Sequence, residues 1–211
     1  MTTVTIEKPA YLGLLNAISL GESNAGKYLT AWANVTPDPQ LKKALCLVAG
    51  RETSHGVVFC QLIERLGFSL REREDPTLAE KLRVYGDPAC SDAEKIRFGR
   101  RDREESDDSA NDFLASIDAK VNDESVDSLT RDTLRWYVHE ERDSGELLRA
   151  EYARVEAMAS GRGMNGSSNG HAMGVSADAR AIMDCMTQGF ASLQQSMKEL
   201  SDALAKRSRE K

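Results

Sequence analysis

Apolar residues recur along residues 39–66 with the spacing of an α-helix, and two polar residues interrupt the pattern at its middle. The inward positions step alternately by four and three: Leu41, Leu45, Val48, Glu52, His55, Phe59, Leu62 and Leu66. Residues at this spacing lie on one face of a helix. Asp38 suits an N-cap, Pro39 a first turn and Gly67 a C-cap. The pattern therefore predicts a long helix that buries a carboxylate and an imidazole among apolar side chains.

The preceding segment has a similar pattern, from the first-turn proline at Pro9 to about Val35. Its inward positions are Leu15, Ile18, Glu22, Ala25, Leu29 and Trp32. Glu22 lies 15 residues before Pro37, in the connecting turn, and Glu52 lies 15 residues after it. In an antiparallel pair of helices these two carboxylates reach the same height. The symmetry about the turn therefore predicts a shared site for both.

Two more helices are predicted in the second half of the chain, after a long connection over residues 68–90 that holds a short helix ending near Tyr85. The first, over about 91–121, opens with a capping box, Ser91 to Glu94. The second runs from about 127 to 158, with an inward set of Leu134, Tyr137, Glu141, Ser144, Leu148, Tyr152 and Val155. Glu140, next to Glu141, points away from this apolar face.

The middle of the helix over 91–121 leaves two alternatives open. Glu105 lies 18 residues before Asp123, in the connecting turn, and Glu141 lies 18 residues after it, so depth favours Glu105 as a partner of Glu141. The helix face instead favours Arg103 and Ser106 as the inward residues, because they lie on the same face as the apolar positions Ile96, Gly99, Ala110, Phe113 and Ile117. An inward Arg103 could pair with Glu141 through its guanidinium group.

This layout of a central Glu, then Glu-x-x-His, then a long crossover resembles the ferritin-like superfamily, in particular the rubrerythrin-type di-iron carboxylate bundles. The resemblance covers about residues 9–158 and implies an all-α, ferritin-like four-helix bundle. Carried over by position, Glu22, Glu52 and His55 match one metal half-site, and Glu141 matches the bridging carboxylate of the other. Ser144 stands where the second half-site has a histidine, so that half-site departs from the family pattern.

The resemblance implies bound iron or manganese, as one or two ions. The metal set is Glu22, Glu52, His55, Glu141 and, with Glu105 inward, that residue too. With Arg103 inward, one metal or none would bind. We expect a metal-binding protein that handles oxygen or peroxide. If the protein is an enzyme, the resemblance implies a non-haem iron oxidoreductase. The alternative is a catalytically degenerate scaffold or partner-binding protein, which the serine at Ser144 favours.

The end of the chain changes character at residues 159–174, which are rich in Gly, Ser and Asn and predict a flexible linker. Beyond it, residues 175–208 predict an amphipathic helix with a heptad seam from Ala179 to Leu204. We expect this tethered helix to form a homo-oligomer. Packing back on the bundle and binding another protein are the other readings.

Composition narrows the partners. A net charge of −6 without a long basic run argues against nucleic-acid binding. No apolar run approaches the ~20 residues that a membrane helix needs, and no secretory signal precedes Pro9, so a cytoplasmic location is expected. The four cysteines form no Cys-x-x-Cys pair, which excludes a rubredoxin-type centre. Any electron donor would therefore be external.

Overall fold

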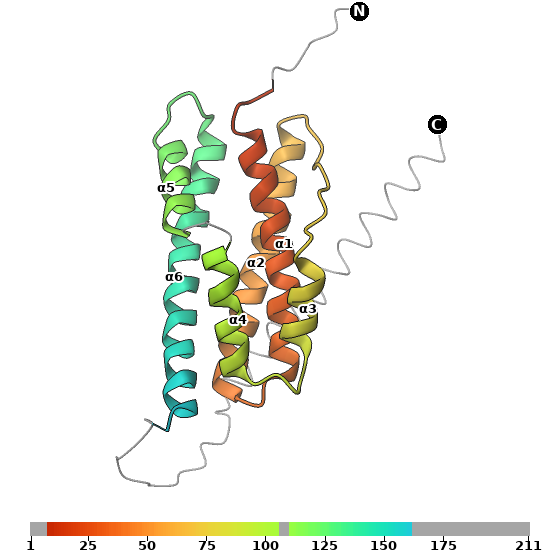
Figure 1. Cartoon of the computed structure of the whole chain (residues 1–211). Helices are drawn as coiled ribbons and strands as arrows, with labels where there is room; N and C mark the ends of the chain where they lie inside the picture. Colours follow the sequence, from red (N-terminus) through yellow and green to blue (C-terminus); the bar gives the residue numbers. More distant parts are fainter. Residues whose placement is uncertain (1–7, 106–109, 162–211) are drawn as a thin grey trace, which may run out of the picture. The chain divides into compact units, whose positions relative to one another are not determined.

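The computed structural model describes residues 8–105 and 110–161, with the side chains at 102–105 and 110–112 left out of the description. Within these ranges the protein is all helical, which confirms the predicted all-α class (Figure 1). The helices are α1 (Leu12–Val35), α2 (Pro39–Arg65), α3 (Leu78–Gly86), α4 (Asp92–Glu105), α5 (Ala110–Val121) and α6 (Ser128–Ala159).

An antiparallel pair, α1 and α2, forms the centre of the fold (Figure 1). Asp38 caps α2, since its Oδ1 atom accepts hydrogen bonds from the backbone N–H groups of Gln40 and Leu41. Gly67 follows the helix with a φ of 84°, a backbone conformation that glycine adopts without strain. Helix α2 therefore begins and ends where the sequence predicted.

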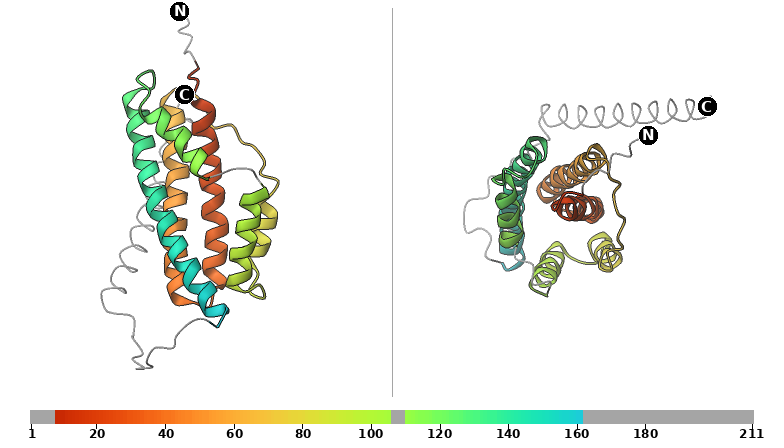
Figure 2. Two further views of the ribbon diagram at one scale, coloured as in Figure 1. Left: turned by 60° about the vertical axis from the view of Figure 1, so that its left-hand side comes forward. Right: turned by 90° about the horizontal axis from the view of Figure 1, so that it is seen from above.

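The remaining helices cover part of this pair. Helix α6 packs along α2, α5 and α4 pack on α6, and α3 packs on α1 (Figure 2). Ser91 opens α4 as predicted, with its backbone N–H and its hydroxyl both donating to the Glu94 carboxylate.

The structure corrects the prediction of one continuous helix across residues 91–121. Helices α4 and α5 lie on separate axes (Figures 1 and 2). The sequence holds a physical reason, because no large apolar residue occurs between Gly99 and Phe113. Apolar burial supplies most of the free energy that holds a helix against its neighbours, so this stretch has little to anchor it.

The apolar core consists of two clusters. One includes Leu15, Ile18, Phe59, Ile117 and Leu134, and the other includes Leu29, Leu41, Leu45, Val48 and Val155. On α1, α2 and α6 the predicted acidic residues fall between the positions that feed the two clusters. The buried polar residues thus lie at the middle of the helix assembly.

Residues 1–163 form one compact unit. The predicted heptad helix over 175–208 and nearly all of the predicted linker fall outside the described residues, so both stay predictions. No described helix is both long enough and apolar enough to span a bilayer.

Candidate metal centre

Four of the five predicted metal ligands meet at one point. Helix α1 supplies Glu22, α2 supplies Glu52 and His55, and α6 supplies Glu141. One ligand atom from each residue lies within 4.8 Å of the corresponding atom of every other residue. His55 is fully buried, and Glu22 and Glu52 are only 8% and 7% exposed. The side chain of Glu105, the fifth predicted ligand, is outside the described side chains.

Close approach of α1 and α2 brings Glu22 to Glu52 and His55. A Cβ atom at Gly26 would collide with the Thr53 hydroxyl, and a Cβ atom at Gly56 would collide with the Ser23 hydroxyl. The Ser19 hydroxyl donates to the Gly56 carbonyl at 2.8 Å and ties the helices together at the level of the site. The two glycines therefore set the interhelical distance that the cluster requires.

Three buried atoms of the cluster lack a hydrogen-bond partner: Glu22 Oε2, His55 Nδ1 and Glu141 Oε1. They face one another, since Nδ1 lies 3.5 Å from Glu22 Oε2 and 3.3 Å from Glu141 Oε1. Leaving a buried polar atom unpaired costs ~1–3 kcal/mol, and more for a charged group. A cation among the three atoms would satisfy all of them, so the donor set fits a metal ion.

The other ring nitrogen of His55 is held by a residue that sequence reasoning placed outside the site. Nε2 lies 2.9 Å from Glu140 Oε2 on α6. The prediction that Glu140 points away is therefore wrong. Its side chain leaves the flank of the apolar face and reaches His55 while remaining 30% exposed. An N–H donated from Nε2 to this carboxylate leaves the Nδ1 lone pair free for an ion, which is the usual arrangement of metal-binding histidines.

A second supporting residue is Tyr137, for which the helical spacing favoured core filling over a role as an electron relay near the site. It is 1% exposed, and its hydroxyl donates to Glu22 Oε1 at 2.7 Å. Its ring packs edge-on against His55, with centroids 5.1 Å apart. Tyr137 thus fixes one Glu22 oxygen and leaves the other facing the cluster.

The acidic groups of the cluster do not ionise independently. Burial and the adjacent Glu22 carboxylate raise the pKa of Glu52 to about 11. Burial opposes ionisation of Glu22 too, but interactions with His55, Glu52 and Tyr137 outweigh it and lower the pKa of Glu22. Burial and the Glu22 charge raise the pKa of Glu141. Without an ion, protons therefore balance the cluster.

His55 is protonated by the same surroundings. Burial alone would lower its pKa, but the carboxylates of Glu141, Glu22 and Glu140 raise the pKa to about 10. A metal ion requires a neutral imidazole and ionised carboxylates as ligands, so it would replace protons on these residues.

The position expected to carry a second histidine holds Ser144, which is buried. Its hydroxyl accepts a hydrogen bond from Arg51 Nη1 at 3.1 Å, and the same nitrogen lies 2.5 Å from Asp143 Oδ2. A guanidinium group therefore occupies the surroundings of the missing ligand, although it comes from α2 and not from Arg103, whose side chain is not described. The described residues supply ligands for one ion.

Comparisons with known proteins add nothing to the geometry of the cluster. No protein-family model, no curated protein and no solved structure matches the chain.

Proposed function

We propose that Glu22, Glu52, His55 and Glu141 bind one iron or manganese ion, and that the chain is a ferritin-like protein that handles oxygen or peroxide. The observation that carries this proposal is the set of three unpartnered buried atoms, one each from Glu22, His55 and Glu141, that face one another. Without an ion, a protonated His55 must balance these buried carboxylates at 3.3–3.5 Å, too far for good hydrogen bonds, and a bound cation would take over that role.

The donor set indicates the class of metal. Three carboxylates and one imidazole suit iron and manganese better than calcium or magnesium, which prefer oxygen ligands alone. The absence of thiolate ligands disfavours a structural zinc site, and the nearest cysteines on the same helix, Cys46 and Cys60, do not belong to the cluster. Iron and manganese both change oxidation state, which a protein acting on oxygen or peroxide needs.

The residues around the cluster support such a role. Glu140 orients the imidazole, and Tyr137 holds one Glu22 oxygen, so Nδ1 and Oε2 stay directed at the centre. The rings of Tyr137 and Trp136 cover His55 from two sides, with centroids 5.1 Å and 5.0 Å away. When bound, a redox-active ion would exchange electrons with oxygen or peroxide. Carboxylates that ionise on binding would balance its charge.

The second candidate is a degenerate bundle that serves as a scaffold or partner-binding protein and oligomerises through its C-terminal helix. The Arg51 contact with Ser144 favours it, since a cation of the protein lies where a second ligand set would be needed. In that case the four residues would be a remnant without bound metal.

Metal content separates the candidates. The full chain would be stripped with chelator, loaded with Mn(II) or with Fe(II) under anaerobic conditions, desalted and analysed for metal. We expect one ion per chain, and a loss of at least about tenfold in affinity for Glu52→Gln and His55→Ala, since each removes a ligand. Glu64→Gln is the matched control, because Glu64 is exposed on the same helix. Metal content equal in all four proteins would reject the proposal.

A further inference from the structure

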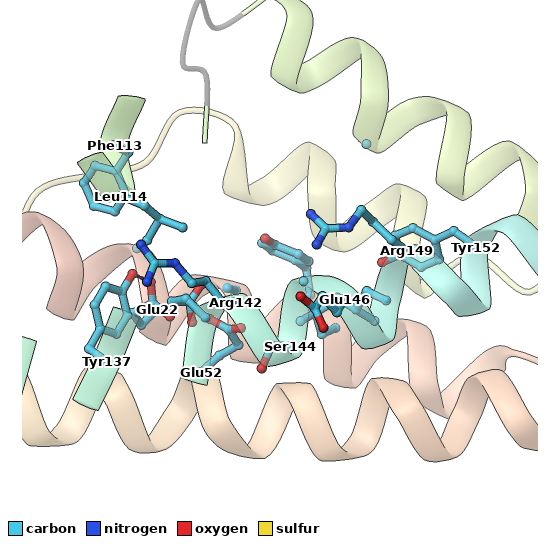
Figure 3. Close-up of a pocket in the computed structure, with 18 of the residues that line it drawn as sticks. Glu22, Glu52, Phe113, Leu114, Tyr137, Arg142, Ser144, Glu146, Arg149 and Tyr152 are labelled. Carbon is cyan, nitrogen blue, oxygen red and sulfur yellow. Dashed lines mark hydrogen bonds between the residues drawn. The ribbon is translucent and has the colours of Figure 1, made fainter. Parts of the chain in front are cut away.

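A cavity of about 730 Å³ adjoins the candidate metal centre (Figure 3). Three of the four proposed ligands, Glu22, Glu52 and Glu141, form part of its wall. The cavity extends from them along α6, past Ser144 and Glu146, to Arg149 and Tyr152 (Figure 3). Oxygen and peroxide need no space of this size. Cavities of ~300–1,000 Å³ are typical of sites for organic molecules with tens of atoms.

A stacked group of aromatic rings forms part of the cavity wall. Trp32 stacks with Tyr85 and with Tyr152, at centroid distances of 5.2 Å and 5.5 Å. Tyr28 stacks with Tyr85 at 5.2 Å, and all four residues line the cavity. Trp32 is only 1% exposed beneath these stacks, so the partly exposed rings of Tyr28 and Tyr152 are the aromatic surface open to a ligand. Such a surface favours a flat aromatic ligand, which gains apolar burial and ring contacts.

Glycines on two helices keep the cavity wide. Nothing lies within 4 Å of where a Cβ atom would stand at Gly21 on α1, and only Arg149 Nη1 approaches that point at Gly145 on α6, at 3.8 Å. A glycine inside a helix costs ~1 kcal/mol relative to alanine. Neither glycine is needed for close helix packing, so its effect at these positions is to leave space in the cavity.

One cation at the cavity wall is available to a ligand. Arg142 is bound by Asp118, at 2.6 Å from Nη2 to Oδ2. Arg149 also lines the cavity, and it makes no hydrogen bond or ion pair with any residue in the described part of the chain. Figure 3 shows its guanidinium group directed toward the cavity from α6. An anionic group of a ligand would find its partner there.

We infer that this cavity binds a planar aromatic molecule with one anionic group. The ring system lies against the partly exposed rings of Tyr28 and Tyr152, and the anion pairs with Arg149. The opposite edge of the molecule faces the carboxylates of the proposed metal centre. The inference deepens the proposed function, on which it rests for the nature of the ion, by naming the class of organic molecule that the site would act on.

A pair of fluorescent probes tests both halves of the inference. Anilinonaphthalene sulfonate is anionic and carries a planar naphthalene ring system, and phenylnaphthylamine has the same rings without the sulfonate. The chain has only two tryptophans, Trp32 and Trp136, and only Trp32 lines the cavity. In the full chain with Trp136→Phe, we expect energy transfer from Trp32 to the bound sulfonate probe.

A variant that fills the cavity tests the location. Gly145→Leu projects a side chain into the open space, and we expect about tenfold weaker probe binding or more because the ligand's volume is taken. Gly13→Leu is the matched control, since Gly13 lies in α1, has nothing within 4 Å and does not line the cavity. Circular dichroism verifies that both variants fold. Equal probe affinity in Gly145→Leu and the unmodified chain would overturn the inference.

A variant of the exposed Arg149 tests the anion site and needs no change to the interior. Arg149→Gln should reduce the preference for the sulfonate probe over the neutral probe by about fivefold, as expected for one partly solvated ion pair. Arg131→Gln, on the same helix but away from the cavity, should leave the preference unchanged. An unaltered preference in Arg149→Gln would remove the anionic group from the inferred ligand.

Metal titration of the same proteins keeps the two proposals apart. Probe binding as described without metal binding supports the cavity inference and contradicts the proposed function. Metal binding without a response of Trp32 to the probes does the reverse.

Discussion

His55 has both ring nitrogens directed by acidic neighbours. Nε2 lies against Glu140, and Nδ1 faces Glu22 and Glu141 without a hydrogen bond. A ring held in this way keeps one orientation, so the position of Nδ1 is set before any ion binds. The geometry makes Glu140 a positioning residue for His55, the proposed metal ligand.

Removing the charge of Glu140 should therefore weaken metal binding without removing a ligand. We expect Glu140→Gln to lower the affinity for Mn(II) about tenfold, within the ~10–100-fold range typical of residues that hold a metal-binding histidine. Isothermal titration calorimetry measures the effect. Asp132→Asn, an exposed acid on the same helix, is the control and should bind as the unmodified chain does. Equal affinities for both variants would remove Glu140 from the site.

The pKa values of Glu52 and His55 predict how pH affects the metal-free protein. Both are raised in the folded state, from 4.5 to about 11 and from 6.5 to about 10. Groups with raised pKa values contribute stability below their unfolded pKa, and the contribution is lost as pH rises through the folded pKa. In chelator, the melting temperature should fall between pH ~6.5 and ~10. The melting temperature of the Glu52→Gln protein should fall less over this interval, because glutamine does not ionise.

Bound metal should counteract this fall in melting temperature, because an ion replaces the protons on the same residues. The difference in melting temperature between Mn(II)-loaded and metal-free protein should therefore grow with pH over the same interval. A difference that is constant or shrinks would show that these side chains do not exchange protons for metal.

At the scale of the helices, the α1–α2 pair carries the site and was predictable. The equal spacing of Glu22 and Glu52 about Pro37 placed them at one height, and the alternating steps of four and three placed them on facing sides. Helix α6 was predictable for Glu141, which lies in the inward set. Glu140 was not, because adjacent helix positions differ by about 100° and a strict apolar face does not count a long side chain at its flank.

The helix over 91–121 shows where such patterns fail. Its charged middle has no large apolar residue to define an inward face. The distance from the connecting turn therefore favoured Glu105 as inward, whereas the apolar positions on either side favoured Arg103 and Ser106. The division into α4 and α5 follows from the same lack of apolar residues. A pattern predicts an element only where burial specifies its orientation.

The close packing of α1 and α2 yields a prediction at this scale. Gly56→Ala should lower the free energy of unfolding by ~1–3 kcal/mol, because the added methyl group collides with Ser23 and forces the helices apart. Gly50→Ala should be neutral or stabilising by up to ~1 kcal/mol, since it adds helix propensity in open space. Urea denaturation measures both. A Gly56→Ala protein as stable as Gly50→Ala would show that the helices are not held at contact distance there.

At the scale of the whole molecule, the chain combines the compact unit of residues 1–163 with the predicted heptad segment over 175–208. Nearly four heptads of apolar residues, many of them methionine, favour association with another helix. We propose that this segment forms the homo-oligomer.

Light scattering after size-exclusion chromatography tests the proposal. The full chain should have a mass of at least twice its 23.2 kDa, and a chain ending at Gly161 should be a monomer. Truncation should leave metal content per chain unchanged, because every proposed ligand lies before that residue. If both proteins contain the same number of chains per particle, the heptad segment has another role.

The most direct measurement is anomalous diffraction from crystals of the manganese-loaded protein. We predict a single strong peak per chain between the Glu22, Glu52 and Glu141 carboxylates, at about 2.0–2.3 Å from His55 Nδ1. A peak elsewhere, or a well-ordered cluster without one, would contradict the proposed metal centre.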